Sequence, residues 1–104
     1  MKRGEVWWVD FEAPIGRRPA VLISRNQAYR IRSSFTVVPL TRKARGIPVE
    51  VSLGPADGIP RKSVANTDSI MTVHKDRFLA FVTALSPERI EALNQAISFA
   101  LDLP

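Results

Sequence analysis

Short apolar segments, separated by loops rich in proline and glycine, make up most of the chain before residue 86. They are rich in β-branched and aromatic residues and too short for stable helices, which is typical of strands. The pattern predicts strands at residues 4–11, 20–24, 35–41, 47–53 and 78–85, with a shorter one beginning at residue 63. Strands of this length, joined by tight loops, favour a small, strongly bent antiparallel sheet or barrel.

One helix is predicted, at the C-terminal end of the chain. Ser86 is suited to cap its first turn, and Pro87 suits its first helical position. Apolar residues then recur at helical spacing, at Ile90, Leu93, Ile97 and Leu101. The predicted fold class is therefore mainly β with a C-terminal helix, in a single domain over residues 1–104.

Three further expectations concern local structure. Residues 12–19, EAPIGRRP, are predicted to form a loop because two prolines and a glycine interrupt regular structure. Residues 25–34 are polar and predict a short helical turn, capped by Ser24 or Asn26. Pro39 indicates a strand end or a bulge in the third predicted strand, because proline has no N–H for the ladder.

The positive charge is concentrated in one segment. The net charge is +5, from 15 Lys and Arg residues against 10 Asp and Glu residues. Residues 13–49 contain no acid but eight cations, namely Arg17, Arg18, Arg25, Arg30, Arg32, Arg42, Lys43 and Arg45. The other cations share the rest of the chain with all the acids. A basic segment on an otherwise acidic chain indicates a surface that binds a polyanion such as nucleic acid, with a merely solubilising surface as the alternative.

Composition also bears on the compartment. The chain has no cysteine, which excludes disulfides and thiolate metal sites and fits a reducing compartment. The N-terminal residues turn acidic too early for a signal peptide, and no apolar stretch approaches the roughly 18 residues that cross a bilayer. We therefore expect a cytoplasmic protein that is not bound to a membrane.

Several familiar kinds of active site find little support in the sequence. His74 is the only histidine, so a multi-histidine metal site is excluded, and we expect it on the surface rather than in catalysis. Asp10 and Glu12 are two residues apart, but acids at a strand end are usually solvated rather than an acid–base pair. No glycine-rich phosphate loop of recognised spacing is present.

Arginine and a hydroxyl remain as candidates for chemistry. Arg18 stands directly before Pro19, which holds the preceding backbone extended and so sets where the guanidinium leaves the sheet. Thr41 ends the third predicted strand, and it meets Arg18 at one end of the sheet if the second and third strands are neighbours. A guanidinium and a hydroxyl on one phosphate can stabilise a pentacoordinate transition state. On these residues alone, the alternative is that Arg17 and Arg18 decorate a loop and that Thr41 merely favours a strand.

Such a site suits RNA better than DNA. RNA carries its own nucleophile, the 2′-hydroxyl, beside the scissile phosphate, so the protein needs only to align it and neutralise charge. Neither a metal nor a cofactor is then required. Because the pKa of arginine exceeds about 12, the residues leave open which group moves protons.

Four segments resemble the MazF/PemK toxins, which are sequence-specific endoribonucleases of toxin–antitoxin modules. These segments, which cover nearly the whole chain in the family's order, are GEVWWVDF, RRPAVLIS, FTVVPLT and SPERIEALNQAISFALDL. The resemblance implies a small, partly open antiparallel SH3-like barrel (MazF/CcdB-like) that forms dimers. It also implies cleavage of single-stranded RNA, without metal, to a 2′,3′-cyclic phosphate and a free 5′-hydroxyl.

By the same resemblance, Arg18 and Thr41 correspond to the family's catalytic pair, in which the arginine stabilises the phosphate and is proposed to take part in proton transfer. Four further cations are expected to bind RNA, namely Arg17, Arg25, Arg42 and Lys43. Arg17 has no fixed role in the family, and solvent exposure is the alternative for it. Asn66 and Asp68 lie in a stretch that resembles the family's RNA groove. They are expected to read base edges, with structural hydrogen bonding in that turn as the alternative.

The resemblance also implies partners. These are a homodimer mate, an RNA substrate of the messenger, transfer or ribosomal class, and a cognate antitoxin with a disordered C-terminal tail that covers the RNA groove. Of Trp7 and Trp8, one is expected in the core and the other at the dimer or antitoxin surface. The loop EAPIGR is short, with Glu12 as its only acid. Because this loop helps relatives to choose their RNA sequence, the cleavage motif does not carry over.

Two other functions stay open at this point. One is a gyrase-poisoning toxin on the same fold, which binds a protein and cuts nothing. Relatives of that kind typically carry an aromatic residue in their C-terminal residues, and ALDLP has none, which counts against it. The other is a non-catalytic nucleic-acid-binding barrel, which the charge pattern alone allows.

Overall fold

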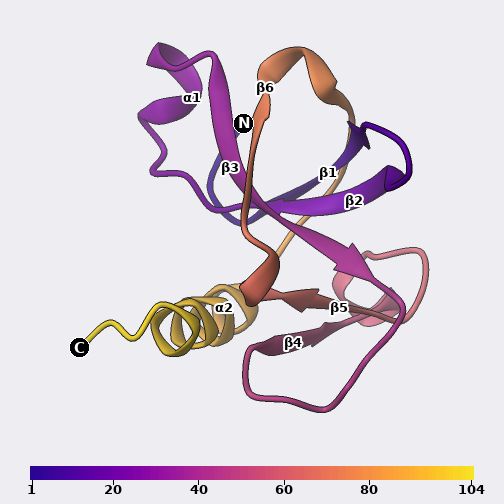
Figure 1. The fold of residues 1–104 in the computed structure, drawn as a ribbon, viewed down its shortest axis with the longest axis vertical. Helices are drawn as coiled ribbons and strands as arrows, with labels where there is room; N and C mark the ends of the chain where they lie inside the picture. The colour runs from indigo at the N-terminus through magenta and orange to yellow at the C-terminus, as the bar shows by residue number, and fades with distance from the viewer.

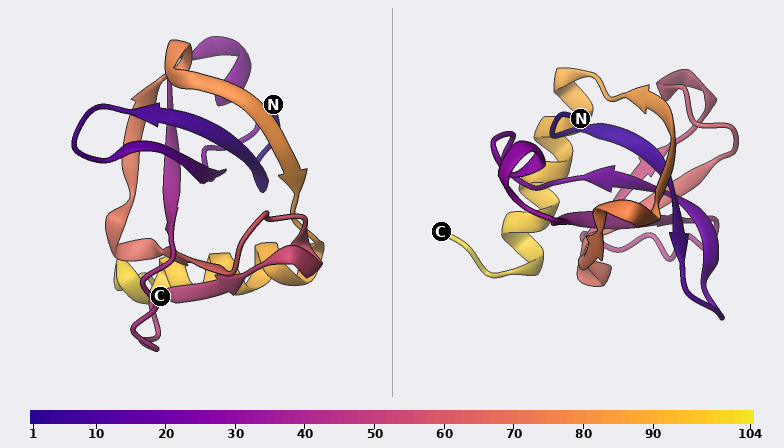
Figure 2. Two further views of the ribbon diagram at one scale, coloured as in Figure 1. Left: turned by 90° about the vertical axis from the view of Figure 1, so that its right-hand side faces the viewer. Right: turned by 90° about the horizontal axis from the view of Figure 1, so that it is seen from above.

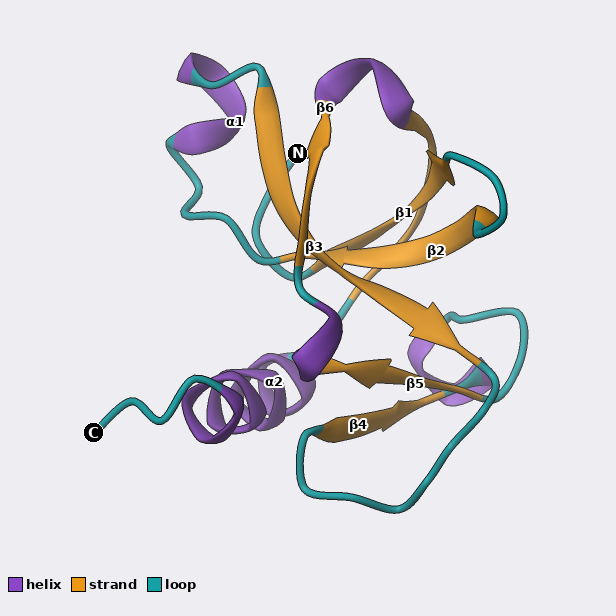
Figure 3. Cartoon of the chain, in the orientation of Figure 1, coloured by secondary structure: helices purple, strands orange, loops and turns teal.

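The structure is a computed structural model that describes residues 1–104. Its strands form one bent antiparallel sheet in the order β4-β5-β3-β2-β1-β7, with β6 paired to β3 outside this order (Figures 1 and 3). The strands are β1 (Glu5–Phe11), β2 (Gly16–Leu22), β3 (Ser34–Thr41), β4 (Glu50–Leu53), β5 (Ser63–Asn66), β6 (Met71–His74) and β7 (Phe78–Ala84). The helices are α1 (Ala28–Ile31) and α2 (Pro87–Ala100), with 3-10 turns η1 (Pro55–Asp57), η2 (Thr67–Ser69) and η3 (Lys75–Arg77).

Strand β3 runs through the middle of the molecule and changes partners along its length (Figure 1). On one edge it pairs with β6 over residues 34–37 and then with β5 at Leu40 and Thr41. On the other edge it pairs with β2 only over residues 37–39. The start of β2 and the end of β3 therefore separate, and a space opens between them.

The barrel is partly open, as predicted. Strands β4 and β7 are the two ends of the strand order and do not pair with each other. Strand β7 pairs with β1 alone, although the two are far apart in the chain. The predicted fold class, mainly β with a C-terminal helix, is confirmed.

Two buried clusters lie on opposite faces of the central strands. Val21 belongs to the larger cluster, and its neighbours Ala20 and Leu22 belong to the smaller one, because successive side chains of a strand point to opposite faces. The larger cluster packs the central strands against β4, β5 and α2, through residues that include Leu53, Ile59, Ala65, Leu93 and Ala96. The central strands are thus packed on both faces. This packing holds in place the edges of β2 and β3 where the two strands separate.

Helix α2 begins as predicted and packs beside β4 and η2 (Figure 2). The Ser86 hydroxyl accepts a hydrogen bond from the Arg89 N–H at 3.2 Å. Leu93 and Ala96 are buried in the larger cluster. Leu101 was predicted to share this face, but it is 55% exposed because the helix ends at Ala100. No helix of the structure is long and apolar enough to cross a membrane.

The predicted loop over residues 12–19 is shorter than expected. Strand β2 begins at Gly16, because its pairing with β1 continues down to Gly16 opposite Phe11. Arg17 and Arg18 therefore belong to a strand and not to a loop, and Pro19 lies inside it opposite Trp8.

Pro39 likewise lies inside a strand, opposite Ala20, and no bulge interrupts the pairing there. The Ile23 N–H donates to the Thr36 carbonyl, and hydrogen-bonded pairs alternate along an antiparallel ladder. The nitrogen of Pro39 therefore points away from β2, to the edge where β6 has ended and β5 has not begun. No ladder hydrogen bond is lost, so the predicted strand end was wrong.

Two smaller predictions are also corrected. The turn α1 exists, but neither Ser24 nor Asn26 caps it, because the Ser24 hydroxyl accepts from the Thr36 N–H and the Asn26 amide oxygen accepts from the Arg3 N–H. Neither tryptophan is buried. Trp7 packs edge-on against Phe81, and Trp8 lies on the wall of a pocket, so both are half-buried.

Candidate functional site

A pocket of ≈ 620 Å³ occupies the space between the start of β2 and the end of β3. Its third wall is the loop between β4 and β5, residues 54–62, which we call the β4–β5 loop. The pocket is lined by Trp8, Arg17, Arg18, Pro19, Leu40, Thr41, Arg42, Lys43, Ile59, Pro60, Arg61 and Ser63. A volume of this size is within the range of pockets that bind small molecules, and it exceeds what one phosphate group needs.

Arg18 and Thr41 come together here, because the second and third strands do pair, which was the condition set for this placement. The two strands stop pairing at Ala20 and Pro39. Arg18 is two residues before Ala20, and Thr41 is two residues after Pro39, so both stand at the same level just beyond the last pair. Both are half-buried and line the pocket.

The Thr41 hydroxyl is free to donate a hydrogen bond to a ligand. Its oxygen accepts a hydrogen bond from the Lys43 N–H at 3.3 Å, in the turn that follows β3. Because a hydroxyl is donor and acceptor at once, this contact leaves its hydrogen available to a ligand. The structure thus offers a hydroxyl donor and a guanidinium around one space.

The pocket is cationic and contains no acid. The cations that line it are Arg17, Arg18, Arg42, Lys43 and Arg61. None of them takes part in an ion pair, since the ion pairs of the chain are His74–Asp76, Arg77–Glu12 and Arg89–Asp57. Asp10 lies directly across the β-ladder from Arg17, but it forms no ion pair with it. Several unpaired cations around one cavity favour an anionic ligand, and their guanidinium groups suit phosphate.

Three of the residues expected to bind RNA lie outside the pocket. Arg25 follows the far end of β2, beside the start of β3, so the length of the strand separates it from Thr41. Asn66 and Asp68 lie at the end of β5 and in η2, and the Asn66 side-chain oxygen accepts from the Asp68 N–H at 2.9 Å. That contact is the structural hydrogen bond that was the alternative for this turn.

Arg17, Arg42 and Lys43 do line the pocket, and so do residues that the sequence did not single out for it, of which Arg61, Ser63 and Trp8 are the polar and aromatic ones. Arg61 lies outside the basic segment, so the charge pattern does not mark it. Ser63 is buried, and its hydroxyl donates to the Arg61 carbonyl at 3.0 Å. Trp8 lies across the ladder from Pro19 and offers an aromatic surface. Only strand alternation, together with the pairing of β1 and β2, could have indicated from sequence where its side chain lies.

Groups with shifted pKa values lie elsewhere. Burial raises the pKa of Tyr29 to about 12, and its hydroxyl donates to the Ser24 carbonyl. Burial also acts to raise the pKa of Asp57, but the Gly54 N–H and the Arg89 guanidinium outweigh it, so the pKa of Asp57 lies below its ordinary value. Neither residue lines the pocket, and His74 is paired with Ser34 at the opposite end of β3 from Thr41.

The arrangement can therefore bind an anion and stabilise developing negative charge. It offers several cations and the Thr41 hydroxyl, but neither a histidine nor a carboxylate within the pocket. No group of three or more His, Cys, Asp or Glu side chains in the structure is placed to hold a metal ion. These features suit an anionic group such as a phosphodiester.

Known proteins show the same chain pattern and fold. A family model described as "PemK-like, MazF-like toxin of type II toxin-antitoxin system" matches residues 2–101. The probable endoribonuclease MazF5 of Mycobacterium tuberculosis is 41% identical over 102 residues, which cover 96% of this chain and 92% of that protein. Endoribonuclease MazF1 of Mycobacterium bovis is 32% identical over 98% of this chain and 93% of its own.

A solved structure agrees with the sequence matches. It is described as an endoribonuclease in complex with its cognate antitoxin from a mycobacterial species. It superposes with a TM-score of 0.89 at 30% identity, and the match covers 100% of this chain and 97% of that chain. A family match over nearly all residues and a shared fold lead to one conclusion: the chain belongs to the PemK-like, MazF-like toxins of type II toxin–antitoxin systems.

Proposed function

We propose that this chain is a sequence-specific, metal-independent endoribonuclease toxin that cleaves single-stranded RNA. The observation that carries the proposal is the meeting of Arg18 and Thr41 in a cationic pocket at the point where β2 and β3 separate. The naming of the matched relatives as endoribonucleases supports the same activity. We assign the activity to one domain over residues 1–104, because the central strands contribute to both buried clusters.

In the proposed mechanism the RNA supplies the nucleophile. The 2′-hydroxyl oxygen attacks the adjacent phosphorus, so that an O2′–P bond forms while the P–O5′ bond breaks. The 2′-hydroxyl loses its proton and the leaving 5′ oxygen gains one, which gives a 2′,3′-cyclic phosphate and a free 5′-hydroxyl. Arg18 stabilises the charge on the pentacoordinate phosphate, and the Thr41 hydroxyl donates to one of its oxygens.

The remaining RNA contacts follow from where each residue lies. Arg17, Arg42 and Lys43 grip phosphates that enter or leave the pocket. Trp8 offers a surface on which a base can stack, a contact that tolerates any base. Arg25, Asn66 and Asp68 lie outside the pocket, so we assign them contacts with a longer RNA.

The proposed partners are a second copy of the chain and a cognate antitoxin with a disordered C-terminal tail, and the proposed compartment is the cytoplasm. The similar solved structure contains a cognate antitoxin, which supports such a partner here. A flexible acidic segment suits a pocket whose charged side chains are all cationic.

The test is an RNA cleavage assay in excess chelator with mapping of the cut ends. Wild-type protein should give 2′,3′-cyclic phosphate ends at a preferred sequence. Arg18→Ala should lose at least about 2–4 kcal/mol of transition-state stabilisation, the range for one preorganised charge-stabilising donor. Thr41→Val, which keeps the shape but removes the hydroxyl, should also lose activity, whereas Thr41→Ser should retain most of it. Arg32→Ala, on the surface after α1, is the control for charge.

Three outcomes would contradict the proposal. Activity of Arg18→Ala within threefold of wild type would remove the arginine from the mechanism. Intact RNA with a retarded band would indicate a nucleic-acid-binding barrel that does not cut. Gyrase-dependent DNA breaks with intact RNA would indicate the gyrase-poisoning class.

A further inference from the structure

The β4–β5 loop brings a cation to the pocket from a wall other than β2 and β3. Arg61 lies in this loop, its side chain is exposed, and it forms no ion pair with any carboxylate. It lines the same pocket as Arg18 and Thr41. The next residue, Lys62, carries the same charge and is also exposed, yet it does not line the pocket.

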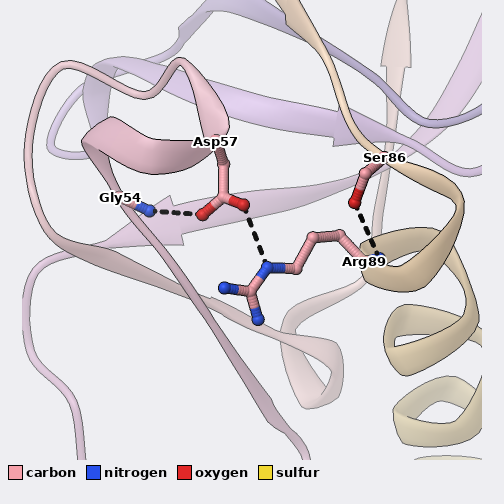
Figure 4. Close-up of polar contacts among 4 residues, drawn as sticks. All are labelled: Gly54, Asp57, Ser86 and Arg89. Atoms are coloured by element: carbon pink, nitrogen blue, oxygen red, sulfur yellow. Dashed lines mark hydrogen bonds and ion pairs between the residues drawn. The ribbon is translucent and has the colours of Figure 1, made fainter.

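The loop is anchored at several points. The Asp57 carboxylate accepts from the Gly54 N–H and from the Arg89 Nε–H of helix α2, each at 2.9 Å (Figure 4). Ile59 is 2% exposed and belongs to the larger core cluster. The backbone at Gly58 lies so close to Thr83 of β7 that a Cβ there would stand 2.5 Å from the threonine Oγ1.

Arg61 itself is held at its backbone. Its carbonyl accepts from the hydroxyl of Ser63, a buried residue at the start of β5. A guanidinium that starts from a fixed backbone loses less freedom when it binds a ligand than one on a mobile loop does. Arg61 is therefore better suited to bind a phosphate than a cation on a mobile surface loop would be.

We propose that Arg61 binds the phosphate next to the scissile one and thereby sets where the RNA strand runs through the pocket. The inference rests on the proposed function, in which Arg18 and Thr41 hold the scissile phosphate. The pocket is larger than one phosphate, and Arg61 reaches it from a different wall than the catalytic pair. Its contact is made to substrate and transition state alike, so it contributes to binding and not to the chemical step.

The experiment first maps the wild-type cut position and then uses an RNA with 2′-deoxyribose at that position, which binds but has no nucleophile. Its affinity is measured by fluorescence anisotropy at several KCl concentrations for wild type, Arg61→Gln, Arg61→Lys and Lys62→Gln. Single-turnover cleavage of the normal RNA is measured at saturating protein, and thermal unfolding checks that each variant is folded.

Arg61→Gln should weaken affinity by about tenfold, as expected for one charge-assisted contact. It should also reduce the slope of log K against log salt by about 0.7, the value for one phosphate of a single strand. Arg61→Lys should restore the slope. Lys62→Gln should change affinity by less than about twofold, because an exposed charge without a contact is screened. The saturated cleavage rate of Arg61→Gln should stay within about threefold of wild type.

Two results would overturn the inference while leaving the proposed function intact. Equal affinities and slopes for Arg61→Gln and Lys62→Gln would show that Arg61 makes no specific contact. Unchanged affinity with a saturated rate lowered more than about tenfold would place Arg61 on the scissile phosphate instead. If wild type neither cuts nor binds RNA, the proposed function itself fails, and Arg61 has no RNA to bind.

Discussion

Pro19 and Pro39 differ in how they affect the ladder between β2 and β3: the Pro39 nitrogen points away from β2, and the Pro19 nitrogen points toward β3. The Ile23 N–H donates to the Thr36 carbonyl, so every second residue from Ile23 back to Pro19 directs its nitrogen toward β3. Pro19 has no N–H to offer there, and the pairing of β2 with β3 begins only at Ala20. The missing donor helps to end the ladder, and the strands separate into the space that the pocket occupies.

Gly58 tests how tightly the β4–β5 loop is packed. Its φ of +84° disfavours any other residue, and an added Cβ would also collide with Thr83. Gly46 has a φ of +68° but no atom within 4 Å of an added Cβ, so alanine there would suffer only the strain of the backbone conformation. We expect Gly46→Ala to lower the free energy of unfolding by about 1–2 kcal/mol and Gly58→Ala by about 1–3 kcal/mol more. Urea unfolding followed by tryptophan fluorescence measures both, and equal losses would mean that the contact with Thr83 relaxes freely.

The β4–β5 loop and α2 are joined by a carboxylate whose protonation should change stability. The pKa of Asp57 is lowered on folding, so its contribution is fully present above the ordinary carboxyl pKa of about 4 and is lost as pH falls through the lowered value. We expect wild type to exceed Asp57→Asn in free energy of unfolding near neutral pH, and the difference to shrink below about pH 4. Asp102→Asn, which removes an exposed carboxylate without an ion pair, is the matched control. A difference that stays constant from neutral to acid pH would contradict the role of the ionised carboxylate.

The elements that the sequence predicts well are those whose signals are local. Helix α2 has its cap and its apolar spacing within one segment, and the pairing of β2 with β3 follows from their closeness in the chain. From sequence, Arg18 and Thr41 could be placed together only on the condition that these strands pair, and the structure meets that condition. Strand β6 has only four residues between two 3-10 turns, too few to show a period, and no separate strand was predicted there.

The part of the pocket that could not be predicted depends on distant contacts. Arg61 reaches the pocket because Asp57 binds Arg89, 32 residues away, and because Ile59 is buried among strands from the whole chain. Neither the periodicity of apolar residues nor a run of charges in the sequence predicts such contacts. Arg25 shows the converse, because it belongs to the basic segment but lies at the other end of β2 from Thr41.

At the scale of the whole molecule, the acidic side chains that make contacts hold elements together away from the pocket. Glu12 pairs with Arg77, and Asp57 pairs with Arg89. Glu50 accepts from the backbone N–H groups of Arg45 and Gly46, which holds the loop that follows Arg42 and Lys43. The cations that line the pocket are left unpaired, so the arrangement of positive charge, more than its total, should govern RNA binding.

Two double variants separate these possibilities, because each lowers the net charge by two. Arg42→Gln with Lys43→Gln removes two cations from the pocket, and Arg30→Gln with Arg32→Gln removes two exposed cations beside α1, at the other end of β3. Each phosphate contact of a single strand contributes about −0.7 to the slope of log K against log salt, so the pocket variant should lose about 1.4 of that slope. The α1 variant should lose much less, because its charges act only through a screened field. Equal changes in slope would show that RNA responds to net charge alone and that these two pocket cations touch no phosphate.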